Sequence, residues 1–288
     1  MCARPQRARA KEHLAPMNAT VSFPALATQP RAHHPFPWRV FGVLLLAALF
    51  GTVTLLPYLG TLLGPTLAGR ALPLELTLVL SLIQPLALSA IAIGVGLRLG
   101  DSVGLGAPSL RDWLRGDAAQ RLRALLLPSV VAGVVVATLL LVLEFGVFVP
   151  NLSAAARGAE APSPPVWQGL LASFYGGIDE EILLRLGVMT LFAWIGARLT
   201  SSFPAAAGVI WTANLLAAIL FGLGHLPVAA ALGPLTGLAI ARVLVLNGLA
   251  GIVYGWLYWR RGLLSAMVAH FATDVVLHGL TPALLAGA

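Results

Sequence analysis

Residues 176–185 read GGIDEEILLR, and the residues on both sides of this stretch are mostly apolar or small. Asp179, Glu180 and Glu181 place three carboxylates in a row, and Arg185 follows four residues after Glu181. Ionisable groups at membrane depth cost free energy, so they are kept where they serve chemistry, transport or assembly. The stretch therefore predicts a membrane-spanning helix that carries a functional site.

The composition of the chain agrees with a membrane location. Of the 288 residues, 58% are hydrophobic and 10% are charged, whereas about 25% are charged in average soluble proteins. A span needs about 20 apolar residues, and such stretches lie at roughly 40–62, 74–97, 124–149, 178–197, 203–225, 234–258 and 263–284. We predict an all-α polytopic membrane helix bundle with about seven transmembrane helices and a four-helix catalytic core.

The chain divides into three predicted parts. Residues 1–36 are rich in Arg, Pro and Ala and predict a disordered basic tail. Residues 37–160 predict about three N-terminal transmembrane helices, and residues 161–288 a catalytic transmembrane domain. The single cysteine, Cys2, excludes an intramolecular disulfide.

Basic residues predict how the chain is oriented. If seven spans alternate, one side receives all but four of the 18 Lys and Arg residues; the exceptions are Arg70, Arg157, Arg185 and Arg242. Since basic residues favour the cytoplasmic side, we predict an integral protein of a bacterial-type inner or plasma membrane with a cytoplasmic N-terminus. The net charge of +7 then needs no nucleic acid as a partner, because the lipid bilayer suffices.

Histidines add a second set of polar residues in the last third of the chain. His225 ends the fifth predicted span, and His270, Asp274 and His278 recur at every fourth position on the seventh. Residues at this spacing project from one helix face. An imidazole and a carboxylate one turn apart can bind a metal ion or can position each other.

Three patterns together resemble the motif set of a known family. Glu180-Glu181-x-x-x-Arg185, Phe221-x-x-x-His225 and His270-x-x-x-Asp274 occur in this order, each on a hydrophobic helix. Over about residues 166–284 the chain resembles the CPBP intramembrane proteases, also called the CAAX-protease and Abi family. The resemblance implies an endopeptidase that hydrolyses a peptide or protein substrate, either prenylated or otherwise membrane-anchored.

The resemblance also implies roles for the residues. In the family the first Glu and the His of the second motif are thought to activate water, which gives Glu180 and His225 here. The third motif is thought to stabilise the oxyanion, which gives His270 and Asp274. An ionised Asp274 would repel an oxyanion, so it serves only if protonated, if it orients His270, or if it ligates a metal.

The residues themselves separate the two adjacent glutamates. Glu181 and Arg185 have the spacing of a helical ion pair, and neighbouring helix residues point about 100° apart, so Glu180 is the freer carboxylate. We interpret Asp179 as a carboxylate at the membrane interface or near a helix start, and Phe221 as a packing aromatic. Arg242 either pairs with a carboxylate such as Glu144 or extends to the interface.

The sequence requires no cofactor, but it permits one. Glu180, His225, His270 and Asp274 offer the nitrogen and oxygen donors that Zn²⁺ accepts, although no His-Glu-x-x-His pattern occurs. Two other classes remain as alternatives: an inactive membrane scaffold or immunity protein of the same fold, and a proton-coupled transporter. A transporter is expected to show an internal repeat, and we find none.

Overall fold

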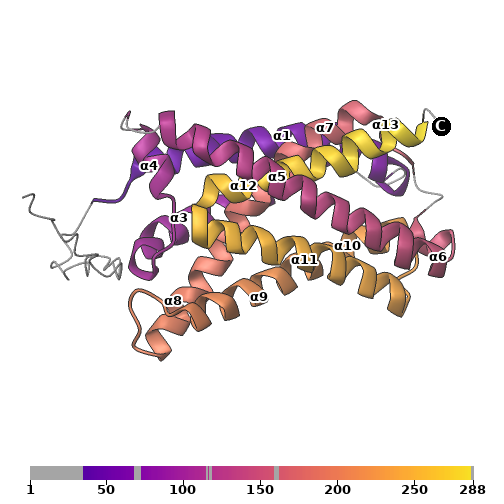
Figure 1. The fold of residues 1–288 in the computed structure, drawn as a ribbon. Coiled ribbons are helices and arrows are strands. Elements are labelled where there is room, and N and C mark those ends of the chain that lie inside the picture. The colour runs from indigo at the N-terminus through magenta and orange to yellow at the C-terminus, as the bar shows by residue number, and fades with distance from the viewer. Residues whose placement is uncertain (1–34, 68–72, 115, 117–118, 159–161, 287–288) are drawn as a thin grey trace, which may run out of the picture. The chain divides into compact units, whose positions relative to one another are not determined.

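The computed structural model describes residues 35–67, 73–114, 116, 119–158 and 162–286. The predicted basic tail falls on residues that lie almost entirely outside this range. Residues Phe36–Ala288 form one compact unit, and its described secondary structure is helical throughout (Figure 1). The all-α prediction is therefore confirmed.

Seven helical segments are long and apolar enough to cross a membrane, which confirms the predicted number. They are Trp38–Pro65, Ile83–Val103, Ala124–Asn151, Val166–Leu199, Ala207–Leu232, Gly237–Arg261 and Leu263–Leu285. The elements that build them are α1 (Trp38–Leu67), α3 (Ile83–Val103), α5 (Ala119–Leu143), η1 (Glu144–Phe148), α6 (Val149–Asn151), α7 (Val166–Tyr175), η3 (Gly176–Glu180), η4 (Ile182–Met189), α8 (Thr190–Leu199), α9 (Ala207–Gly224), α10 (Leu226–Leu232), α11 (Gly237–Arg261), α12 (Leu263–Asp274), η5 (Val275–Leu280) and α13 (Thr281–Ala286). Shorter elements are α2 (Leu74–Leu80), α4 (Pro108–Leu114) and the 3₁₀ turn η2 (Ala155–Arg157).

Two predicted spans were wrong at their boundaries. Residues 74–97 are not one helix, because a turn at residues 81–82 separates α2 from α3. The fourth span begins at Val166 rather than at residue 178. Its first turns contain Gly169 and Ser173, which are buried against neighbouring helices rather than lying in a loop. Small and polar residues of this kind support helix contacts in membranes.

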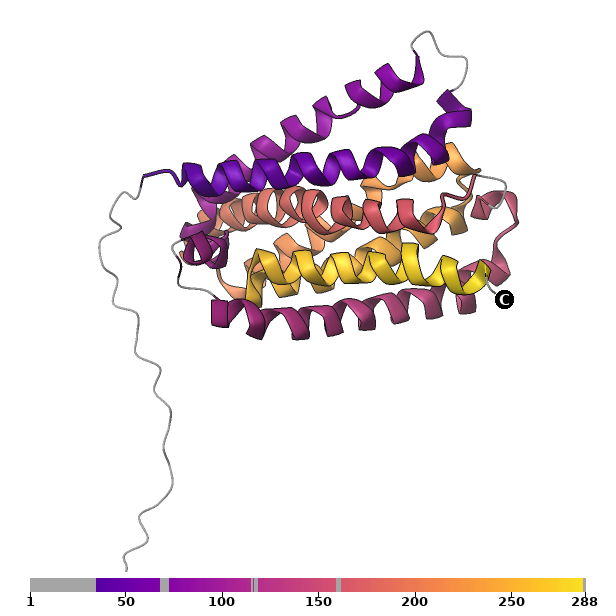
Figure 2. The ribbon, with the colours of Figure 1, turned by 90° about the horizontal axis from the view of Figure 1, so that it is seen from above.

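Close helix contacts are made by small residues. Figure 2 shows the helices packed side by side, with α12 next to α5. At that contact a Cβ added to Gly133 would overlap the carbonyl group of Ala269. The Thr273 hydroxyl donates to the Gly133 carbonyl at 2.9 Å, and the hydroxyls of Ser129 and Ser265 share a hydrogen bond of 2.7 Å. Since apolar side chains gain little by leaving lipid for another helix, such close contacts hold the bundle together.

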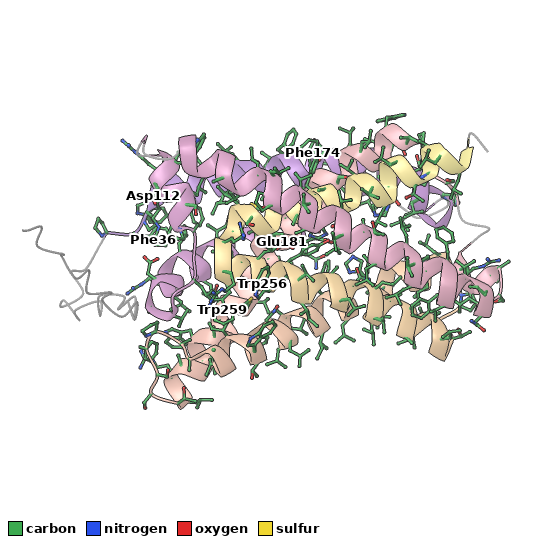
Figure 3. All side chains as sticks on the ribbon, in the orientation of Figure 1. Phe36, Asp112, Phe174, Glu181, Trp256 and Trp259 are labelled. Carbon is green, nitrogen blue, oxygen red and sulfur yellow. The ribbon has the colours of Figure 1, made fainter. Side chains whose placement is uncertain are left out.

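The outer surface of the bundle is apolar. Figure 3 shows carbon-rich side chains projecting outward along the helices. Ile83, Ile91, Val135 and Val142, for example, are exposed. In water such a surface would be a liability, but in a chain with seven apolar spans it faces acyl chains. The protein is therefore an integral membrane protein.

Arg242 is paired rather than free. Its guanidinium donates two hydrogen bonds of 2.7 Å to the two carboxylate oxygens of Glu144. This contact joins α11 to η1, and it settles the alternative left open for Arg242. A two-pronged arginine–carboxylate contact fixes both distance and orientation.

The fourth span contains two π-helical segments. η3 and η4 flank Glu181 and carry Asp179, Glu180 and Arg185. A π-helix bonds each residue to the fifth one along the chain, and such segments occur frequently at functional sites. Here they set the directions of the three consecutive carboxylates.

Candidate functional site

Four predicted site residues meet inside the bundle. Glu180 comes from η3, His225 from the end of α9, and His270 and Asp274 from α12. Glu180 Oε1 lies 3.7 Å from His225 Nε2, and Glu180 Oε2 lies 3.6 Å from His270 Nε2. Asp274 Oδ2 lies 3.7 Å from the same nitrogen of His270. Two ring nitrogens and two carboxylates therefore face one small volume.

The orientation of His225 is set by its own helix. Its Nδ1 lies 2.8 Å from the Phe221 carbonyl oxygen. A carbonyl only accepts, so Nδ1 carries a proton, and Nε2 is the ring nitrogen that faces Glu180. The Phe221 ring meets the His225 ring edge-on at 4.8 Å. The four-residue spacing in the second motif thus fixes both the tautomer and the position of the ring.

His270 is held by Glu181 rather than by its own helix. Its Nδ1 donates to Glu181 Oε1 at 2.9 Å, while Glu181 Oε2 lies 3.3 Å from Arg185 Nε. Glu181 and Arg185 are both fully buried. The predicted ion pair is present, but the contact with His270 was not predicted, because these residues are 89 positions apart and nothing in one sequence links them.

Aromatic rings form one wall of the site. The Tyr254 ring stacks on the His270 ring at 4.4 Å, and the Arg185 guanidinium lies 5.2 Å from the centre of the Phe221 ring and 5.7 Å from that of Tyr254. Cations are attracted to aromatic faces at such distances. Tyr254 was missed from the sequence, where a tyrosine in an apolar span carries no distinguishing signal.

Gly176 makes room for the acidic side of the site. A Cβ added there would overlap the Asp274 carboxylate and would lie 3.2 Å from His270 Nε2. The next residue, Gly177, packs against Phe271 of α12. The two glycines thus let α12 approach η3 closely enough for His270 and Asp274 to reach Glu180.

Two other polar residues lie elsewhere. The prediction for Asp179 was wrong, because the residue lies neither at an interface nor at a helix start. It lies in the interior of the long fourth span and is 2% exposed. It faces α1, where it shares a hydrogen bond of 2.7 Å with the Thr52 hydroxyl. It lies in the interior because the helix begins at Val166, twelve residues before the predicted start at residue 178. His278 lies against the Tyr58 ring at 6.1 Å.

The site is accessible on one side. The side chain of Glu180 is 19% exposed and that of His225 is 33% exposed, whereas His270 is buried. Glu180 and His225 therefore form the exposed side of the site, and His270 and Asp274 lie behind them.

The donor types of the site suit Zn²⁺, but their arrangement does not. Across the described residues, no group of three or more His, Cys, Asp or Glu side chains is positioned to hold a metal ion. The Nδ1 hydrogen bonds of His270 and His225 do not themselves exclude a metal, because a histidine that binds a metal through Nε2 usually donates Nδ1–H to a carboxylate or carbonyl.

Comparison with known proteins agrees with these motifs. Residues 162–276 match the family model described as Type II CAAX prenyl endopeptidase Rce1-like. The matched range contains all four residues of the site and the Glu181–Arg185 pair. Comparisons with curated proteins and with solved structures gave no match. Over residues 162–276, this chain is therefore similar to the Rce1-like type II CAAX prenyl endopeptidases, in agreement with the family that its three motifs resemble.

Proposed function

We propose that the protein is an intramembrane endopeptidase in which Glu180 and His225 activate water. The observation that carries this proposal is the approach of both imidazole Nε2 atoms to the two oxygens of Glu180, at 3.7 and 3.6 Å. A water molecule between Glu180 and His225 Nε2 has two proton acceptors beside it. General-base catalysis needs a proton acceptor within reach of the water molecule that it activates.

The proposed reaction is the hydrolysis of one peptide bond. The water oxygen attacks the carbonyl carbon while a water proton passes to the Glu180 carboxylate. The oxyanion of the tetrahedral intermediate accepts a hydrogen bond from Nε2 of His270 in its imidazolium form, whose Nδ1 donates to Glu181. Glu180 then returns its proton to the leaving nitrogen as the carbon–nitrogen bond breaks. Hydrogen-bond donors that are already oriented toward the charge developing in the transition state commonly supply a large part of the rate acceleration.

Asp274 has a positioning role in this scheme. Its Oδ2 lies 3.7 Å from His270 Nε2. An ionised carboxylate beside the imidazolium keeps that ring in place and balances its charge. We expect Asp274→Asn to retain part of the activity, because an amide can still contact the ring, and Asp274→Leu to retain much less.

We propose a membrane-anchored polypeptide as the substrate. The site lies within helices that span the membrane, and its exposed members, Glu180 and His225, belong to the fourth and fifth spans. A soluble polypeptide would have to leave water to reach them. A polypeptide that already carries an apolar anchor would not.

The proposal is tested by the set of C-terminal fragments in membranes of cells that make the wild type or Glu180→Gln. We expect fragments that depend on the wild type to vanish in Glu180→Gln and in His225→Ala, with a normal amount of each protein. Asp101→Asn is the matched control, since it makes the same change at an exposed ion pair with Arg111. Identical fragments with wild type and Glu180→Gln would instead indicate a scaffold without peptidase activity.

The role of a metal is tested on the purified protein. Because the donors are not arranged to hold an ion, we expect peptidase activity to survive dialysis against a chelator. Activity that is lost on dialysis and restored by Zn²⁺ would instead assign Glu180, His225, His270 and Asp274 as ligands.

A further inference from the structure

A cavity of about 280 Å³ lies beside the fourth span, and none of the four site residues lines it. It is bounded by α1, by the turn and first residues of α3, and by Tyr175, Asp179 and Leu183 of the fourth span. In Figure 2, α1 and the segment α2–α3 lie together at one end of the bundle and diverge toward α2. The cavity therefore lies where two lipid-facing helices separate.

Asp179 places a carboxylate beside this cavity, and the two oxygens of this carboxylate have too few hydrogen-bond donors. Its Oδ2 has no partner among the described residues. Its Oδ1 lies 2.7 Å from the Thr52 hydroxyl, but that hydroxyl has a single proton and is also 2.9 Å from the Ala48 carbonyl oxygen. A carboxylate can accept about four hydrogen bonds, and leaving it short of donors in an apolar bundle is costly.

The charge and the size of the cavity indicate what it can receive. Among the described residues that line it, Asp179 is the one that carries a charged side chain. Its volume lies just below the roughly 300–1,000 Å³ of ordinary ligand pockets, so it suits one long side chain rather than a whole lipid. Its leucine walls, such as Leu55, Leu59 and Leu88, suit the methylene stem of a basic side chain.

The surfaces on both sides of the cavity are apolar and exposed. Val53 of α1 and Ile83 and Ile91 of α3 project outward. A second transmembrane helix can lie against them, and charged residues inside membranes pair with one another. We propose that this cavity receives a lysine or arginine side chain from a transmembrane helix of a partner protein, with Asp179 as its counter-ion. This inference does not depend on the proposed peptidase activity.

The test uses the full chain in phosphatidylcholine vesicles, with an acceptor dye on its single cysteine, Cys2. The probes are donor-labelled leucine-rich helices of about 20 residues with lysine, glutamine or leucine at the centre. Energy transfer is measured against the peptide-to-lipid ratio. We expect the lysine peptide to reach half-saturation at a ratio on the order of tenfold lower than the glutamine peptide.

Two variants make the test decisive. Asp179→Asn removes the charge, and Leu59→Trp keeps the charge but fills the cavity; both should abolish the preference for lysine. Asp101→Asn, the matched control outside the cavity, should retain it. Equal binding of lysine and glutamine peptides to the wild type would overturn the proposal, as would an unchanged preference in Asp179→Asn. If Asp179→Asn fails to fold, Leu59→Trp alone decides, since a preference unaffected by it rules out the cavity.

Discussion

Two adjacent glutamates show how surroundings assign different roles to the same side chain. Glu181 is enclosed between His270 Nδ1 and Arg185, whereas Glu180 faces two imidazole Nε2 atoms and remains partly exposed. The i,i+4 spacing predicted the partner of Glu181 along the helix. The partner across the bundle could not be predicted, because it depends on how α12 packs against the fourth span.

At this scale we expect Glu181→Gln and Arg185→Met to lower stability as well as activity. Each leaves the other charge buried without its partner, which costs roughly 3–5 kcal/mol for a fully buried pair. Thermal unfolding of the purified variants measures this loss, and Glu180→Gln, at a more exposed position, should unfold near the wild-type temperature. The double variant Glu181→Leu/Arg185→Leu should regain stability without regaining activity. Equal destabilisation by all three single changes would contradict this division of roles.

At the scale of elements, the motifs were readable because each lies within one helix. The pairs Phe221 with His225 and His270 with Asp274 are four residues apart, and the structure places both members of each pair at the site. The π-helical form of η3 and η4 was not predicted, since apolar periodicity distinguishes a helix from a strand but not one helix type from another. Thr52 and Asp179 are 127 positions apart, so no local pattern in the sequence predicts their contact.

Gly176 tests the approach of α12 to η3. In Gly176→Ala the new methyl group would push the Asp274 carboxylate and crowd His270 Nε2. We expect a large loss of peptidase activity with little loss of protein, because a flexible side chain can move aside while the backbone stays. Gly94→Ala is the matched control, since a Cβ there meets nothing within 4 Å. Similar activity in the two variants would show that the position of Asp274 matters little.

At the scale of the molecule, the number of spans was predictable from hydropathy, but the depth of the site was not. The predicted span of residues 178–197 would place Glu180 close to one end of the span, and therefore near one face of the membrane. Because the helix begins at Val166 and ends at Leu199, Glu180 lies about 21 Å from its start and so near mid-membrane. His270 and Asp274 can therefore reach it.

The basic residues still predict which end is cytoplasmic. The turn after α8 lies beside the end of α3, since a Cβ on Gly104 would be 3.7 Å from Pro204, and the α11–α12 turn lies beside α4, where Gly262 approaches Ser109. Arg198 and Arg260 therefore share one end of the bundle with Arg98. By the rule that basic residues stay inside, this end is cytoplasmic. His225, at the other end of α9, then faces outward.

A cysteine scan in the Cys2→Ser background tests this orientation. Ala230 in α10 and Thr200 after α8 are both exposed and lie beyond opposite ends of α9. We expect Ala230→Cys to react with a membrane-impermeant thiol reagent in intact cells, and Thr200→Cys to react only after the membrane is opened. This result would favour an exported or outward-facing anchored polypeptide as the substrate, because the exposed edge of His225 would open to that side. The reverse labelling would turn the site toward the cytoplasm, where a prenylated protein with a CAAX terminus becomes the leading substrate class.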